Sequence, residues 1–405
     1  VDSSSGKVSS YDVRRGKVNN IRILNYNQVN EMFLNRKDVG RHKVSDTTVQ
    51  DDLHLLASLA SVINRRRVHI GRALNAVDAH SDLSIYPLPL PILADKMLDR
   101  PQFFTGFPEI RLRFADHTNT ERLGTFDQIP GGITSESMVS EMMILAGRVA
   151  GSFGLDHNIP LPYRVQPEPS DTELAIINEL KNPETGAMAM SKLISKDVFL
   201  PTGNSSIKPG IHYALGVRPI PQNDINSDAF HRGGYVRVTS PLRRFADLKC
   251  HWQLKAELSG EKHPFNFETM SQLLVQFDQM DNWVKQIERA SSRYWLWVYI
   301  NRTLSKKQNY DSEGRSDYTT FFTPEEQALL EPIPAIQNIM DVRFNSETLQ
   351  STVRISLPQL GGLPVDCEWP TGKSAPKKDE IRKVKIIRAE SAGLKRTIVC
   401  TLSLI

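Results

Sequence analysis

The stretch GGYVRVTSPLRRFADL, residues 233–248, carries the most specific pattern in this chain. It contains a short alternating run, Tyr235–Val238, that predicts a strand ending at Thr239. Ser240 and Pro241 then form a strong helix start, because serine is a good N-cap and proline fits the first helical position. We therefore predict a strand followed by a helix whose first N–H groups are free to meet an anion.

Two arginines follow at once, at a position that the helix dipole disfavours. Arg243 and Arg244 lie in the first turn of the predicted helix, where a cation costs about 0.3–1 kcal/mol. A bound phosphate would compensate, and Asp247, four residues after Arg243, can orient its guanidinium for a bidentate contact. A structural arginine–aspartate pair that caps the helix explains the same residues. Both interpretations stay open at this point.

Upstream, the periodicity predicts several elements and two sets of charged candidates. The predicted elements are short β structure in 8–23, a short helix over 29–34, and longer helices over 46–73 and 135–153. Arg65 and Arg66 lie in the C-terminal half of the first long helix, where they either complement its dipole or face a phosphate backbone. Glu141 lies on the flank of the apolar stripe of the second long helix.

Downstream, an apolar stripe predicts a long helix over 269–307, and the polar segment 308–334 is predicted to be a linker. After Pro334 the pattern changes to alternation, with five strand candidates separated by glycine turns, which is typical of a small OB-type barrel. The barrel segment is basic and includes Lys383 and Lys385. Its cations either follow the phosphates of an oligonucleotide or form a solvated edge that blocks strand pairing.

The composition is that of a globular protein of two or three domains. The chain has 405 residues, of which 40% are hydrophobic and 24% are charged, and a formal net charge of +4. These values exclude a collagen, a low-complexity polymer and a disulfide-stapled mini-protein, and they are compatible with a nucleic-acid partner without indicating one. The three cysteines are far apart in the sequence, which fits a reducing compartment. No apolar run reaches the roughly 18 residues of a membrane span.

The run TSPLRRFAD at 239–247 resembles TSPIRRYAD, a signature of the RNB (RNase II) family of processive 3′→5′ exoribonucleases. Further segments resemble family segments in the same order. These are ILNYNQV at 23–29, the arginine-bearing helix at 53–74, MVSEMMILA at 138–146, YRV at 163–165, HYALG at 212–216 and IERA at 287–290. The resemblance covers most of the chain and is nearest to the fungal mitochondrial members.

The resemblance implies an α+β fold in three parts. Residues 1–307 would be the C-terminal part of an RNB catalytic domain, a mixed sheet packed with long helices. Residues 308–334 would be a linker, and residues 335–405 an OB-type RNA-binding barrel.

The resemblance also implies roles for individual residues. Arg243 would clamp the scissile phosphate or its neighbour, Glu141 would accept a hydrogen bond from the 2′-OH of the terminal ribose, and Tyr26 would stack on the 3′-terminal nucleotide. These three are the expected catalytic residues. The expected RNA-binding residues are Thr239, Ser240, Arg244, Asp247, His212, Tyr213, Arg65, Arg66, Lys383 and Lys385. Core packing is the alternative explanation of His212 and Tyr213.

Two departures from the family pattern stand out. Residues 219–232 look like an insertion, and the aspartate cluster that binds metal in the family, upstream of its tyrosine segment, is not found. Asp2 and Asp12 do not reproduce it. We therefore expect no metal ligands in this chain, and Mg²⁺ held by aspartates upstream of Val1, in a missing N-terminal part of the same protein.

The expected function is that of a 3′→5′ exoribonuclease that degrades single-stranded RNA processively to nucleoside 5′-monophosphates during RNA turnover. By resemblance, its compartment would be the mitochondrial matrix, and an RNA helicase of a mitochondrial degradosome would be a partner. The alternative is an RNB-type pseudonuclease that binds RNA or serves as a scaffold without cleavage. An upstream acid cluster of the type D-x(5)-D-x-D-D would decide for the nuclease.

Overall fold

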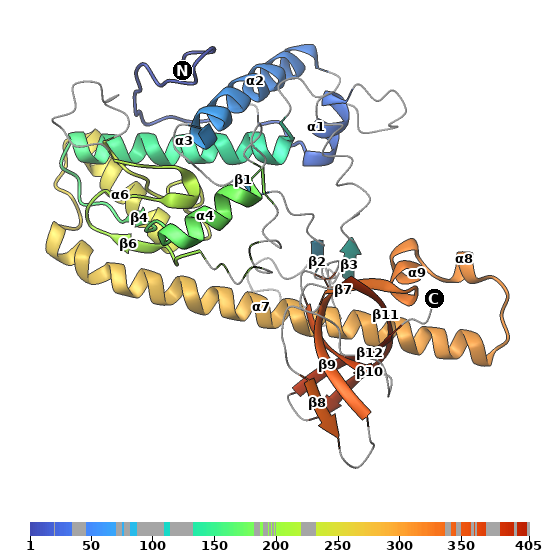
Figure 1. Ribbon diagram of the computed structural model, residues 1–405. Coiled ribbons are helices and arrows are strands. Elements are labelled where there is room, and N and C mark those ends of the chain that lie inside the picture. The colour runs from blue at the N-terminus through green and yellow to red at the C-terminus, as the bar shows by residue number, and fades with distance from the viewer. Residues whose placement is uncertain are drawn as a thin grey trace, which may run out of the picture. The chain divides into compact units, whose positions relative to one another are not determined.

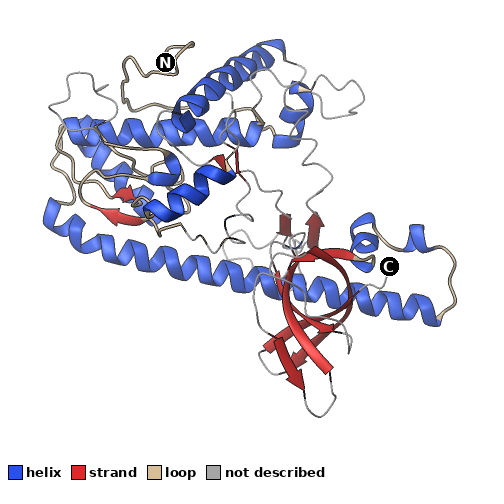
Figure 2. Cartoon of the chain, in the orientation of Figure 1, coloured by secondary structure: helices blue, strands red, loops and turns tan. Residues whose placement is uncertain are grey.

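The fold is described from a computed structural model, coloured along the chain in Figure 1 and by secondary structure in Figure 2. It forms two compact units, one of Val1–Val77 with Glu121–Trp283 and one of Asp78–Thr120 with Val284–Ile405. The residues that the structure describes are 1–19, 21–34, 46–69, 75–76, 82–86, 109–113, 133–181, 187–188, 193, 196, 198, 200–219, 232–336, 342–345, 350–357, 360, 363–369, 381–392 and 395–402.

Three helices of the first unit pack together: α1 (Tyr26–Phe33), α2 (Thr47–His69) and α3 (Ser135–Asp156). The side chain of Asn25 caps α1 through a reciprocal capping box with Gln28, so the helix starts before the predicted residue 29. Apolar side chains from the three helices meet in one cluster. Its buried members are Val29, Phe33, Ala57, Ala60, Ile133 and Met138.

Glycines on α3 allow the segment before the TSPLRR run to lie against that helix. The N–H of Val236 donates to the carbonyl of Gly147 at 3.1 Å, and a Cβ at Gly147 would lie 2.5 Å from the carbonyl oxygen of Val236. A Cβ at Gly151 would meet the carbonyl oxygen of Gly233 at the same distance. The predicted strand over 235–238 is therefore only an extended segment, with a single bridge between Val236 and Tyr163.

By length and composition, α3 is also the one helix of the described part that could cross a membrane. Of its most apolar window, 44% is buried inside the fold, so length and composition alone are weak evidence for a membrane span.

Short strands and the helix α4 (Asp171–Leu180) also pack in the first unit around this segment. Strand β4 (Tyr163–Val165) pairs antiparallel with β6 (Asn204–Ser206), and the N–H of Arg164 donates to the carbonyl of Tyr235 at 2.8 Å. Further elements are the parallel pair β1 (Asn75–Ala76) and β5 (Ala187–Met188), and a 3-10 turn at Tyr213–Leu215. In the second unit, β2 (Asp82–Tyr86) pairs antiparallel with β3 (Glu109–Arg113).

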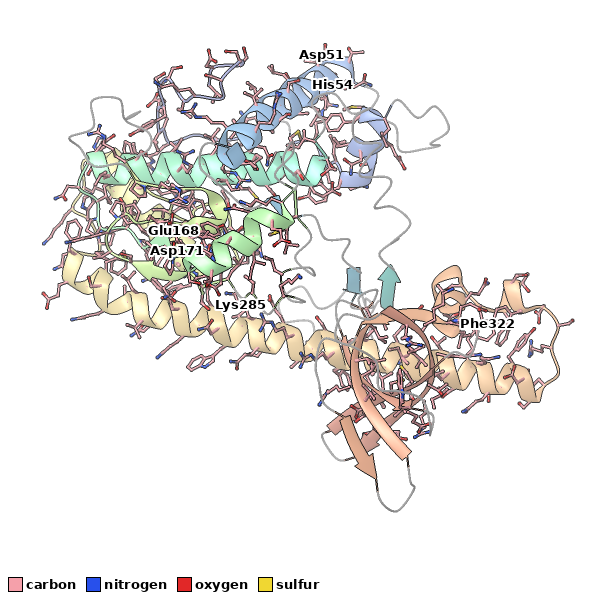
Figure 3. All side chains as sticks on the ribbon, viewed as in Figure 1. Asp51, His54, Glu168, Asp171, Lys285 and Phe322 are labelled. Atoms are coloured by element: carbon pink, nitrogen blue, oxygen red, sulfur yellow. The ribbon has the colours of Figure 1, made fainter. Side chains whose placement is uncertain are left out.

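The predicted long helix is confirmed as α7 (Phe267–Ser312), which has 46 residues and extends beyond residue 307. Two ion pairs of 2.7 Å attach its first part to the first unit, Arg164 with Asp278 and Arg237 with Asp281. Its middle stretch, residues 282–293, is exposed on every side. Lys285, labelled in Figure 3, lies in this stretch.

Within the predicted linker 308–334, the structure places the end of α7 and two short helices, α8 (Tyr318–Phe321) and α9 (Pro324–Leu330). They surround an aromatic cluster that includes Tyr310 and Phe322, and the ammonium of Lys306 lies 4.9 Å from the ring centre of Phe322. Phe322 is labelled in Figure 3. The polar composition of the segment thus concealed a small packed core.

The C-terminal strands form a closed ring. The strands are β7 (Ile333–Ile336), β8 (Val342–Asn345), β9 (Gln350–Leu357), β10 (Leu363–Trp369), β11 (Ile381–Ala392) and β12 (Lys395–Leu402). Their order in the sheet is β10-β12-β11-β7-β9-β8, and β10 also pairs with β9. This second pairing closes a ring of five strands, β10, β12, β11, β7 and β9, while β8 pairs with β9 outside the ring. Among the described pairings of this barrel, β10 and β12 run parallel and the other pairs run antiparallel. This is an OB-type barrel, as predicted, although β7 had been assigned in part to the linker.

Candidate functional site

The TSPLRR run forms a separate turn before the helix and not the first turn of the helix. Helix α6 (Phe245–Ser259) begins four residues after the predicted start, because its N-cap is Arg244, with extended backbone angles of φ −124° and ψ 118°, and not Ser240. The N–H groups of Arg243 and Arg244 donate to the carbonyl of Ser240 at 3.2 and 3.0 Å, which closes a tight turn. The predicted start at Ser240 is therefore wrong, and Arg243 lies outside the helix.

Asp247 holds this turn together and pairs with the second arginine, not with the first. Its Oδ2 accepts hydrogen bonds from the N–H of Ser240 at 3.0 Å and from Nε and Nη2 of Arg244 at 3.0 and 2.7 Å. Nη2 of Arg244 also lies 3.4 Å from Oγ1 of Thr239. Asp247 is fully buried. The expectation that Asp247 orients Arg243 is corrected: the structural pair is Arg244–Asp247, which leaves Arg243 to other partners.

Arg243 is exposed at the tip of the turn. Within the part of the chain that the structure describes, its side chain makes no hydrogen bond or ion pair, and the neighbouring Leu242 is completely exposed. A guanidinium in this position is permanently charged and offers its full fork of donors to an incoming anion. The turn therefore presents one cation for binding and uses the other for its own stability.

Glu141 lies in a buried network between α2 and α3. Its Oε1 accepts from Nδ2 of Asn64 at 2.7 Å and from Nη2 of Arg67 at 2.5 Å, and its Oε2 accepts from Nε of Arg67 at 3.0 Å. Nη1 of Arg67 donates to the carbonyl of Leu215 at 3.3 Å. Glu141 is only 2% exposed. It was expected on the flank of its helix, but α2 crosses there and an arginine neutralises it.

Sequence reasoning named Arg65 and Arg66 on α2 as RNA-binding residues, but it did not single out Arg67 among the other cations of that helix. In the structure Arg65 is exposed and Arg66 is half-buried, and neither has a recorded contact with Glu141. A signal for Arg67 was available. Ala60 and Ile63 mark the buried face of α2, and Arg67 continues that face at steps of four and seven residues.

Tyr26 lies where the first residue of α1 meets the start of α3. Its backbone carbonyl accepts a hydrogen bond from Oγ of Ser135 at 3.1 Å, and Oδ1 of Asn30 accepts from the N–H of Ser135 at 2.8 Å. Its side chain is 48% exposed. The backbone of Tyr26 is therefore fixed while its ring is free to stack on a ligand.

His212 and Tyr213 lie inside the first unit. Tyr213 is 2% exposed and belongs to an apolar cluster with Ile177, so it fits the packing interpretation. The His212 ring lies edge-on to Tyr235 at 5.8 Å. Burial, followed by the nearby charges of Arg164 and Arg237, lowers the pKa of His212 to about 4, so the ring is neutral near pH 7.

The two lysines of the barrel lie in the second unit. Lys383 and Lys385 are exposed on β11, where they alternate with the buried Val384 and Ile386. Their side chains therefore lie on the outer face of the barrel, a placement that is compatible with both interpretations drawn from the sequence.

The described residues do not provide a metal centre. Among them, no group of three or more histidines, cysteines, aspartates or glutamates is placed to hold a metal ion. Asp247 is committed to Arg244, and Glu141 is committed to Arg67 and Asn64. The residues present therefore do not fit the divalent ion that the resemblance implies.

The fold and the turn define a class of protein. A family model described as RNB domain matches residues 1–260, and the chain belongs to this family. Among curated relatives, an uncharacterized ribonuclease of Synechocystis is 34% identical over 219 residues, which are 54% of this chain and 30% of that protein. The mitochondrial exoribonuclease II of Schizosaccharomyces pombe is 28% identical over 241 residues, 58% of this chain and 22% of that protein.

Solved structures show the same fold. The Dss1 exoribonuclease of Candida glabrata, crystallised as an active-site mutant, matches 94% of this chain and 38% of its own with a TM-score of 0.55 and 17% identity. RNase R of Mycoplasma genitalium, in complex with ribose-methylated single-stranded RNA, matches 93% of this chain and 53% of its own with a TM-score of 0.53 and 15% identity. The chain thus spans less than a third of the curated relatives named above.

Proposed function

We propose that this protein is a 3′→5′ exoribonuclease that degrades single-stranded RNA processively to nucleoside 5′-monophosphates. The observation that carries the proposal is the exposed Arg243 on a turn fixed by the buried Arg244–Asp247 pair, within the residues that match the RNB domain. The names of its relatives, which are ribonucleases and mitochondrial exoribonucleases, support the proposal.

In this proposal Arg243 binds the phosphate at the scissile bond or the one next to it. Charge accumulates on the phosphate oxygens as the bond breaks, and a fixed guanidinium stabilises this charge without having to reorganise. Asp247 contributes indirectly, because it holds Ser240 and Arg244 in place and so sets the direction in which the turn presents Arg243. Thr239, Ser240, Arg244 and Asp247 therefore support the site by shaping the turn.

Tyr26 and Glu141 would recognise the 3′ end of the strand. The exposed ring of Tyr26 would stack on the terminal base. Glu141 would accept a hydrogen bond from a ribose 2′-OH through Oε2, which accepts only one recorded hydrogen bond, whereas Oε1 accepts two. Because Glu141 is almost fully buried, this contact also requires α2 to move slightly so that the ribose can reach the carboxylate.

The cofactor, partner and compartment in this proposal follow from the resemblance. Mg²⁺ would supply an activated water and stabilise the leaving 3′-oxygen, held by aspartates from a further part of the same protein. A helicase of a mitochondrial degradosome would deliver RNA, and the mitochondrial matrix would be the compartment. Mitochondrial relatives support the compartment.

Replacement of Arg243 tests the proposed function. In protein that also carries the metal-binding aspartates proposed above, and with Mg²⁺ present, Arg243→Ala should lower the rate of cleavage of a labelled single-stranded RNA about 100- to 1000-fold, because one charge-stabilising group is lost. Arg289→Ala is the matched control, since Arg289 is an exposed arginine on α7. Thermal unfolding should be unchanged in both variants. Undiminished cleavage by Arg243→Ala would contradict the site assignment. If protein that carries those aspartates binds RNA without any cleavage, the pseudonuclease is supported.

A further inference from the structure

One face of α6 continues directly from the Arg243 turn and carries alternating aromatic and cationic side chains. Phe245, Lys249, Trp252 and Lys255 follow one another at steps of four, three and three residues, which places them along one side of the helix. Phe245 is 48% exposed, Trp252 is 40% exposed, and Lys255 is exposed. We call these four residues the α6 stripe.

Lys249 lies at the centre of the stripe, among three aromatic rings. Its ammonium is 4.7 Å from the ring centre of Phe245, 4.6 Å from that of Trp252 and 4.2 Å from that of Phe265. The rings of Trp252 and Phe265 are nearly parallel, 6.3 Å apart with an angle of 17° between them. Phe245 also lies edge-on to Phe277 of α7 at 6.0 Å. Together these contacts fix the orientation of the rings while nearly half of the Phe245 and Trp252 surface remains open.

One alternative is that these contacts only attach α6 to the chain at Phe265. That alternative explains why Lys249 lies among the rings, but it does not explain why Phe245 and Trp252 remain exposed. A purely structural contact would bury its rings, whereas Phe245 and Trp252 stay exposed, and Leu242, three residues before Phe245, is completely exposed. Fixed, exposed aromatic rings are suited to contact a further planar apolar group.

The charge along the stripe is also uncompensated. Four acids of the first unit pair with other groups: Asp247 with Arg244, Asp278 with Arg164, Asp281 with Arg237, and Glu257 with His157 and His263. Lys249 and Lys255 have no recorded ion pair within the described residues. The stripe thus combines exposed aromatic faces with a net positive charge, which is the combination that binds single strands of nucleic acid.

We propose that the α6 stripe is a binding platform for single-stranded RNA, and its relation to Arg243 rests on the proposed function. Bases stack on Phe245 and Trp252, and phosphates lie against Lys249 and Lys255. The helix rises about 15 Å from Phe245 to Lys255, enough for about four stacked nucleotides at 3.4 Å each. The platform holds the strand beside the turn that carries Arg243.

Binding measurements without cleavage test the platform. A 5′-fluorescein-labelled 20-nucleotide single-stranded RNA is titrated with the protein in EDTA, and its anisotropy is followed. Trp252→Ala should weaken binding about five- to hundredfold, because one stacking ring is lost, and Trp252→Phe should restore most of it. Lys255→Ala should lower the slope of log K against log salt by about 0.7, the value for one phosphate contact on a single strand.

Two control variants and one control RNA make these results specific. Trp283→Ala removes a tryptophan that is 60% exposed on α7, and Lys262→Ala removes an exposed lysine after α6; neither should change binding. An abasic oligomer of the same length should bind Trp252→Ala and the unaltered protein equally, because it cannot stack. Unchanged thermal unfolding of each variant excludes a loss of fold.

The outcomes separate this inference from the proposed function. If Trp252→Ala binds the 20-mer as tightly as the unaltered protein while Arg243→Ala binds it more weakly, the platform is refuted and the proposed function stands. If the abasic oligomer also loses affinity for Trp252→Ala, the stacking role is refuted. If the unaltered protein binds no single-stranded RNA at all, the platform and the proposed function are both refuted.

Discussion

His212 is a partly buried histidine that feels the charges of two arginines, and its protonation is tied to the stability of the first unit. Its pKa of about 4 in the folded protein lies below its usual value near 6.5, because burial and the charges of Arg164 and Arg237 disfavour the imidazolium. Between these two pH values the unfolded chain binds more protons than the folded one. Folding stability therefore rises with pH across this window and is lost as the pH falls through it.

We expect this histidine to contribute measurably to acid unfolding. Between pH 6.5 and pH 4 the unaltered protein should lose on the order of 3 kcal/mol through this group, and His212→Gln should lose less over the same range, since glutamine does not titrate. Urea unfolding at a series of pH values measures the effect. Equal pH dependence in the two proteins would show that folding does not hold His212 in its neutral form.

At the same scale, the site residues show how far the sequence could be interpreted. Arg243 and its neighbours were found because their order along the chain is distinctive. The choice of Asp247 partner was not predictable, because Arg243 and Arg244 both lie within reach of it on an ideal helix. The extended backbone at Arg244 decided the matter in favour of Arg244.

Among the elements, α3 depends on its glycines for contact with the segment that leads to the Arg243 turn. Gly147→Ala would place a Cβ 2.4 Å from the Tyr235 ring and 2.5 Å from the Val236 carbonyl oxygen, so the segment must move. We expect a loss of about 1–3 kcal/mol of unfolding free energy, as for other overpacked sites. Gly16→Ala is the control, because a Cβ there meets nothing within 4 Å.

Chemical denaturation of the two glycine variants measures this prediction. Equal stability of Gly147→Ala and Gly16→Ala would mean that the 233–238 segment does not pack on α3 as described. A shift of the segment should also reduce RNA cleavage, because the Arg243 turn follows it directly in the chain.

Helices were the elements that the sequence predicted best. Their apolar periodicity over two or more turns gave α2, α3 and α7 with errors of a few residues at the ends. The predicted start of α6 was wrong. Ser240 and Pro241 favour a helix start by themselves, but in the structure the N–H of Ser240 donates to Asp247 and Ser240 belongs to a separate turn. Local propensity could not reveal this tertiary hydrogen bond.

For the whole molecule, the division into two compact units predicts two unfolding transitions. Ile300 on α7 is fully buried in the core of the barrel unit, together with Leu329 and Val353. Ile300→Ala should lower the stability of that unit by about 2–5 kcal/mol and leave the other transition in place. Val275→Ala, at a 62% exposed position of the same helix, is the control.

Differential scanning calorimetry distinguishes two units that unfold separately from a chain that unfolds in one cooperative transition. One transition should shift in Ile300→Ala and none in Val275→Ala. A single transition that shifts as a whole would show that the chain unfolds as one cooperative body.

The closure of the barrel has a consequence for synthesis and folding. Strand β12 lies between β10 and β11, so it completes the ring from the last described residues of the chain. Until residues 395–402 leave the ribosome, β10 and β11 each keep an unpaired edge, and such edges invite association with other chains. The barrel is therefore prone to association with other chains until β12 has left the ribosome and paired with β10 and β11.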